Sequence, residues 1–68
     1  MSMDILLNGQ AQSVNDIATV SDLLTELGVS TRGIAVEVNG ELVSRSAHST
    51  HRLVSGDRLE IVTLVGGG

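Results

Sequence analysis

The 68-residue sequence contains no cysteine, no proline, no aromatic residue and no lysine. Without cysteine, the chain can form neither a disulfide nor a cysteine-ligated metal site. Its eight acidic residues outnumber its four basic residues, all arginine, and the formal net charge is −4. A chain that has neither excess positive charge nor aromatic rings to stack on bases is a poor candidate for nucleic-acid binding.

Long apolar runs are missing as well, although 41% of the residues are hydrophobic and nearly all of these are aliphatic. No run approaches the roughly 20 residues that cross a bilayer, and the N-terminus lacks the basic and apolar regions of a secretion signal. A chain this short has room for one small core and little room for an active-site cleft. We therefore expect a cytoplasmic binding module or carrier, with one domain over residues 1–65 and a flexible glycine tail over residues 66–68.

Two Asn-Gly pairs, Asn8-Gly9 and Asn39-Gly40, each separate two short segments that read as strands. Asn-Gly is a strong hairpin signal because both central residues of a type I′ turn need a positive φ. The strands expected around the two turns cover residues 3–7 and 10–14, then 34–38 and 41–44.

One segment, residues 19–27, has the pattern of a helix. Thr19 and Asp22 have the spacing of a capping box, and Gly28 stands where a left-handed residue ends a helix. The apolar residues recur at helical spacing and form one stripe: Val20, Leu23, Leu24 and Leu27.

The remaining segments complete a small fold. A Ser/Thr/His-rich connection without periodicity covers residues 45–52, and a short extended stretch and a turn lead to a last strand over residues 58–64. This last strand has to pair somewhere, and the free edge of the first strand is available. The elements predict an α+β fold, a β-grasp (ubiquitin-like) roll, in which one helix packs on one face of a mixed sheet.

Catalytic and metal-binding patterns are scarce. A phosphate-binding P-loop needs a lysine, which is absent. His48 and His51 are three residues apart without a third ligand at compatible spacing, so we expect both in a surface loop. We predict no catalytic residue, no metal site and no bound cofactor.

The glycines Gly66, Gly67 and Gly68 follow directly after the last predicted strand. Glycine has no Cβ, so such a segment can enter a narrow channel and leave the carboxylate of Gly68 free of steric bulk. An ATP-using partner could convert this carboxylate into an acyl-adenylate, which a sulfur nucleophile could then attack. The alternative is that the tail is a frayed end or a cloning remnant.

The face of the sheet away from the helix is a second candidate site. If Ile5 points toward the helix, strand alternation places a set of aliphatic side chains on the outer face, with Ala35 between them. A contiguous apolar patch beside the tail would mark a partner surface, although scattered exposed aliphatic residues are normal. The residues predicted for this interface are Leu6, Leu42, Val62 and Leu64.

Taken in order, these segments resemble the ThiS family, the ubiquitin-like sulfur carriers of thiazole synthesis in the thiamine pathway. The resemblance covers essentially the whole chain. It rests on the strand that ends at Asn8-Gly9, the helix around Leu23-Leu24, the 34–43 stretch with Val-Asn-Gly-Glu-Leu-Val, Arg45, the Leu53-x-x-Gly56-Asp57 turn, and Glu60-Ile61-Val62 before the final glycines.

The resemblance implies a carrier without catalysis of its own. A ThiF-type (E1-like) adenylating enzyme would use ATP to adenylate Gly68, and the resulting thiocarboxylate would donate sulfur to a ThiG-type thiazole synthase. The sulfur would come from cysteine through a desulfurase persulfide. By position, Gly67 and Gly68 match the terminal Gly-Gly of the family, and Gly66 is one glycine more.

Other interpretations of the same elements remain open. The small subunit of molybdopterin synthase shares the fold and the Gly-Gly terminus, but it tends to be longer and to carry Phe and Pro before the glycines. Sulfur carriers for cysteine synthesis or tRNA thiolation are further candidates. A β-grasp interaction module with an incidental tail would bind its partner even without the glycines.

Overall fold

Each Asn-Gly pair forms a tight hairpin in the computed structural model, which describes residues 2–15 and 17–64. Asn8 and Gly9 have φ angles of +49° and +82°, and Asn39 and Gly40 have φ angles of +53° and +85°. Positive φ at both central residues defines the type I′ turn that the sequence predicts. The strands around the turns are β1 (Ser2–Leu7), β2 (Gln10–Asn15), β3 (Ile34–Val38) and β4 (Glu41–Val43).

Helix α1 (Val20–Leu27) begins and ends at the residues that the sequence indicates. The Thr19 hydroxyl accepts a hydrogen bond from the Asp22 backbone N–H (3.2 Å), and the Asp22 carboxylate accepts from the Thr19 backbone N–H (3.1 Å). These two bonds form the predicted capping box. Gly28, with a φ of +69°, adopts the left-handed conformation that terminates the helix.

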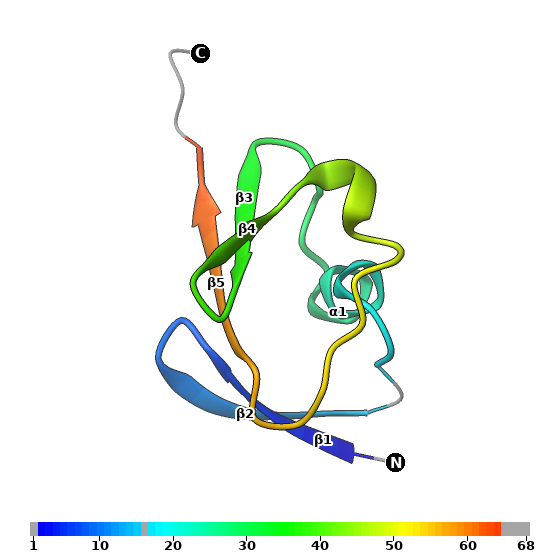
Figure 1. The fold of residues 1–68 in the computed structure, drawn as a ribbon, viewed down its shortest axis with the longest axis vertical. Coiled ribbons are helices and arrows are strands. Elements are labelled where there is room, and N and C mark those ends of the chain that lie inside the picture. The colour runs from blue at the N-terminus through cyan, green and yellow to red at the C-terminus, as the bar shows by residue number, and fades with distance from the viewer. Residues whose placement is uncertain (1, 16, 65–68) are drawn as a thin grey trace.

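Strand β5 (Arg58–Thr63) is the central strand of a five-stranded sheet with the order β2-β1-β5-β3-β4 (Figure 1). It pairs with β1, as predicted, and the two strands run parallel, with Leu6 opposite Arg58. It also pairs antiparallel with β3 from Val38 opposite Leu59 to Ile34 opposite Thr63. The sequence did not predict this second pairing, which joins the two hairpins into one sheet.

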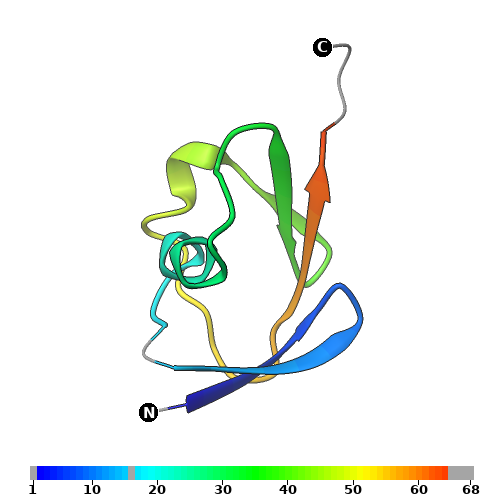
Figure 2. The same ribbon diagram turned by 180° about the vertical axis from the view of Figure 1, so that it is seen from behind.

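The core lies between α1 and the face of the sheet that the helix covers (Figures 1 and 2). Its buried side chains are all aliphatic, and they come from the helix, from all five strands and from the segment before β5: Ile5, Val14, Val20, Leu23, Leu24, Val36, Val38, Val43, Leu53 and Leu59 are each at most 6% exposed. Among the described residues, no helix has the length and apolar character needed to span a membrane.

The connection over residues 45–52, predicted to be irregular, contains a short 3₁₀ helix, η1 (Arg45–Ala47). Backbone carbonyls of this connection accept hydrogen bonds from the first N–H groups of α1. The carbonyl of His51 accepts from the N–H of Val20 (3.1 Å), and the carbonyl of His48 accepts from the N–H of Ser21 (2.8 Å). The first N–H groups of a helix have no partner within the helix, so this connection is an integral part of the fold.

The surface-loop prediction is wrong for His48, whose side chain is only 5% exposed, while His51 is half-buried. The hydrogen bonds to the start of α1 hold the His48 backbone against the helix and bring its side chain inside. Neither ring nitrogen of His48 has a hydrogen-bond partner among the described residues. A buried polar group without a partner costs free energy.

We predict that the Asp22 carboxylate stabilises the fold in a pH-dependent way. The N–H groups of Ala18 and Thr19, which donate to this carboxylate, hold the pKa of Asp22 below its ordinary value of 3.8. Its contribution is therefore complete above that value and is lost as the pH falls through the lowered pKa. The variant Asp22→Asn should be less stable than the wild type near neutral pH, and the difference should shrink in acid.

The chain has no aromatic residue whose fluorescence could report unfolding. Unfolding by urea is therefore followed by far-UV circular dichroism. Glu26→Gln, which removes a carboxylate from the other end of the same helix, is the matched control and should not reproduce the pH-dependent loss. The prediction would be contradicted if the difference in the free energy of unfolding between Asp22→Asn and the wild type stayed constant from pH 7 to pH 3.

A second prediction concerns His48. Leucine is close to histidine in size and has no polar atoms, so His48→Leu should leave the free energy of unfolding unchanged or raise it. Thermal and urea unfolding measure this directly. A destabilisation of more than about 2 kcal/mol would mean that the ring nitrogens make a bond on which the fold depends.

Candidate functional site

The chain leaves the sheet at the end of β5. Thr63 is still paired with Ile34, and the N–H of Leu64 donates to the carbonyl of Gly33 at 2.7 Å. The predicted tail, Gly66, Gly67 and Gly68, lies outside the described residues, so its delivery role stays a prediction. The structure establishes the point of departure, which is one end of the central strand.

The outer face, meaning the face of the sheet opposite α1, carries the four aliphatic residues predicted as a partner interface. Figures 1 and 2 show α1 on one side of the sheet, and no described segment covers the other side. The exposed fractions of these side chains are 38% for Leu6, 70% for Leu42, 48% for Val62 and 57% for Leu64. Their exposure agrees with the strand alternation in the sequence, and their use as an interface stays a prediction.

Charged residues lie between the exposed aliphatic side chains of the outer face. Val62 lies beside Ala35 across β5 and β3, whereas Leu6 lies beside Arg58 across β1 and β5. Arg58 and Glu60 therefore separate the Leu6 end of the outer face from the Val62 end. A partner would need to match both apolar and charged groups on this face.

Two carboxylates stand side by side near the middle of the outer face, because Glu37 of β3 pairs with Glu60 of β5. On the other side of β3, Glu37 pairs with Leu42. Like charges directly opposite each other destabilise a sheet. A basic group from a partner would relieve this repulsion, so the charge pattern favours a partner that is positively charged at this point.

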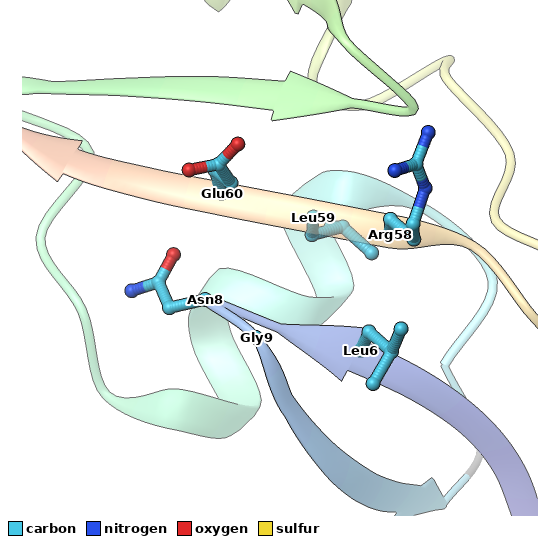
Figure 3. A pocket seen from close by; sticks show the side chains of 6 residues that line it. All are labelled: Leu6, Asn8, Gly9, Arg58, Leu59 and Glu60. Atoms are coloured by element: carbon cyan, nitrogen blue, oxygen red, sulfur yellow. The ribbon is translucent and has the colours of Figure 1, made fainter.

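A shallow hollow of about 350 Å³ lies beside this charged region (Figure 3). It is located where the turn after β1 meets β5, and its lining is mixed in character: Leu6, Asn8, Gly9, Arg58, Leu59 and Glu60. Among residues 2–15 and 17–64, no three His, Cys, Asp or Glu side chains are grouped so that they could hold a metal ion. The hollow thus presents both apolar and charged groups.

The side chains of Asn8 and Asn39 have a second role that the sequence analysis missed. Asn8 Oδ1 accepts from the N–H of Ile61 (2.9 Å), and Asn8 Nδ2 donates to the carbonyl of Ile61 (3.4 Å). Asn39 Oδ1 accepts from the N–H of Arg58 (2.9 Å). Both turn residues thus hold β5, one from each hairpin. The Asn-Gly signal predicts the turn but contains no information about this long-range contact.

The buried carboxylate of Asp57, just before β5, has a structural role. It is 7% exposed, and its two oxygens accept from Asn39 Nδ2 (2.9 Å) and from the N–H of Val54 (2.8 Å). A buried carboxylate satisfied by two donors fixes the turn over residues 54–57 and with it the start of β5.

The mixed sheet with β5 at its centre and a single helix on one face defines the protein as a β-grasp domain. The ThiS family model matches residues 5–68, and the chain belongs to the ThiS family. The crystal structure of the thiamine biosynthesis protein ThiS from Geobacter metallireducens superimposes with a TM-score of 0.84, at 32% sequence identity, and covers 97% of this chain and 100% of that one.

Curated relatives carry two different names. A thiazole synthase from Paramagnetospirillum magneticum is 42% identical over 66 residues, which is 97% of this chain. A thiazole synthase from Magnetococcus marinus is 36% identical over the same length. The chain spans 20% of each of these two relatives. The uncharacterized protein ycf40 of Porphyra purpurea is 34% identical over 68 residues, 98% of this chain and 94% of that protein.

We predict that Val62→Asp weakens binding of a protein partner at the outer face without unfolding the domain. Val62 is 48% exposed on the outer face, so a charge there should change the free energy of unfolding by no more than about 1 kcal/mol. Titration calorimetry with the partner measures the affinity, and circular dichroism measures the stability.

The matched control is Val54→Asp, because Val54 is 60% exposed and lies outside the strands of the sheet. Its affinity should equal that of the wild type. Equal affinities for Val62→Asp and Val54→Asp would show that the outer face takes no part in binding the partner.

Proposed function

We propose that this protein is a sulfur carrier of thiamine biosynthesis that carries sulfur as a thiocarboxylate on Gly68. The observation that carries the proposal is the match to the ThiS family from residue 5 through the final glycines to residue 68. The β-grasp fold supports it, because β5 leads from the centre of a rigid sheet to those glycines. The proposal requires that Gly68 bear the free C-terminal carboxylate.

The chemistry takes place on that carboxylate. In the site of a ThiF-type adenylating enzyme, a carboxylate oxygen attacks the α-phosphate of ATP and pyrophosphate leaves. The terminal sulfur of a persulfide, derived from cysteine by a desulfurase, then attacks the acyl carbon, AMP leaves and an acyl disulfide forms. A thiol attacks the outer sulfur of that disulfide, which releases the thiocarboxylate on Gly68 and leaves the thiol oxidised in a disulfide. The chain itself contributes recognition through the outer face and delivery of the terminal carbonyl through the narrow glycine tail.

The side-chain inventory is consistent with sulfur carried at the chain end. The chain has no cysteine on which to hold sulfur elsewhere and no lysine whose amine could attack the activated carbonyl. The role does not need a catalytic residue in the domain. We propose accordingly that the protein is a co-substrate of other enzymes.

Thiazole synthase is the acceptor that we propose. Two proteins named thiazole synthase contain a region similar to nearly the whole of this chain. Because the carrier-like region is part of a polypeptide named thiazole synthase, it favours thiazole formation over molybdopterin synthesis as the destination of the sulfur.

The test is the mass of the intact chain after incubation with the adenylating enzyme, ATP and a persulfide source. We expect a gain that corresponds to one oxygen replaced by sulfur, and fragmentation should locate it at Gly68. A tag fused after Gly68 converts the carboxylate into a peptide bond and should abolish the gain, because Gly68 then has no carboxylate to attack ATP.

The same tag at the N-terminus is the control and should leave the mass gain intact. A gain in the C-terminally tagged protein would place the sulfur elsewhere and contradict the proposal. The untagged chain could instead show no mass gain while the C-terminally tagged chain still binds the partner normally. This result would favour an interaction module.

A further inference from the structure

The turn residue Asn8 extends the pairing of β1 with β5 beyond the end of the β1 backbone. The parallel pairing covers Leu6 opposite Arg58 and Leu7 opposite Leu59. The N–H of Asn8 adds one more bond, to the carbonyl of Leu59 at 2.9 Å. The backbone then turns away into the hairpin with a φ of +49° at Asn8.

The side chain of Asn8 takes over where the backbone of β1 turns away. Its carboxamide has the same donor and acceptor groups as a peptide bond. It accepts from the N–H of Ile61 at 2.9 Å and donates to the carbonyl of Ile61 at 3.4 Å. Figure 3 shows the Asn8 side chain beside β5 at the end of β1. Asn8 thus serves as one additional rung of the sheet.

We propose that Asn8 is a positioning residue for the carboxylate of Gly68, a role that rests on the proposed function. On its β3 side, β5 is bonded as far as Thr63, opposite Ile34, and Leu64 bonds to Gly33. On its β1 side, Asn8 is the group that bonds Ile61. With Asn8, the strand is held on both sides as far as Ile61, so its direction of departure is fixed.

The distance from Ile61 to the chain end makes this direction important. Seven further residues reach at most about 25 Å when extended. A change in the direction of β5 at Ile61 therefore changes the region that the chain end can reach. Misplacing a reacting group by about 1 Å reduces rates strongly. A looser strand should lower the rate of adenylation more than it lowers partner binding through the outer face.

Asn39 provides a matched control for Asn8. It occupies the same position of the other type I′ turn, with a φ of +53°, and its side chain bonds the opposite end of β5, at Arg58. It also donates to buried Asp57, so its loss should cost at least as much stability. Glycine accepts positive φ, so Asn8→Gly and Asn39→Gly remove the side chains without straining either turn.

The experiment measures adenylation of both variants by pyrophosphate release, at a temperature at which circular dichroism shows each to be folded. For Asn8→Gly we expect kcat to fall about three- to tenfold, because the terminal carboxylate is then positioned less well. The KM for the carrier should stay near the wild-type value. Asn39→Gly should keep the wild-type kcat. Asn8→Asp, which retains the acceptor oxygen and tolerates positive φ, should recover most of the loss.

Amide hydrogen exchange gives a readout that does not depend on the enzyme. The N–H of Ile61 should exchange faster in Asn8→Gly than in Asn39→Gly. Wild-type kcat for Asn8→Gly, or an equal loss of kcat in both glycine variants, would overturn the positioning role of Asn8 and leave the proposed function standing. A wild-type chain that is never adenylated would overturn the proposed function and this role with it.

Discussion

Strand β5 is the constraint on which the rest of the molecule depends, because it bonds to both hairpins. It pairs in parallel with β1 and antiparallel with β3, and these pairings make one sheet from two separate units. The continuous sheet gives α1 a face to cover and leaves the outer face open. The strand that joins the sheet is also the strand that leads to the glycines, so the integrity of the fold and the point at which the chain leaves the sheet are coupled.

The elements that the sequence predicts correctly depend on neighbouring residues. Asn39-Gly40 turns the chain because of its own φ preferences, and Thr19 with Asp22 caps the helix across three residues. The pairing of β5 with β3 could not be predicted in this way, since any alternating strand can pair with any other. Likewise, alternation predicts that Val62 is exposed, but only the register places Arg58 beside Leu6.

The errors and omissions have one physical origin, contacts between segments far apart in the chain. The composition of residues 45–52 predicts a surface loop, but the carbonyl of His48 bonds to the start of α1 and the histidine becomes buried. The contact of Asn8 with Ile61 left no trace in the local pattern either. For the candidate site, the sequence therefore predicts which side chains are exposed, but not which charges and amides surround them.

The order of the strands also has a consequence for folding. Each hairpin can close within a few residues, whereas β1 and β5 come from opposite ends of the chain, and non-local pairing of this kind is slow. Once the sheet is complete, its permanent edges are the polar strand β2 and the three-residue strand β4, both poor templates for aggregation. Until β5 arrives, however, the edges of β1 and β3 are unpaired. The nascent protein is thus more vulnerable to intermolecular strand pairing than the finished one.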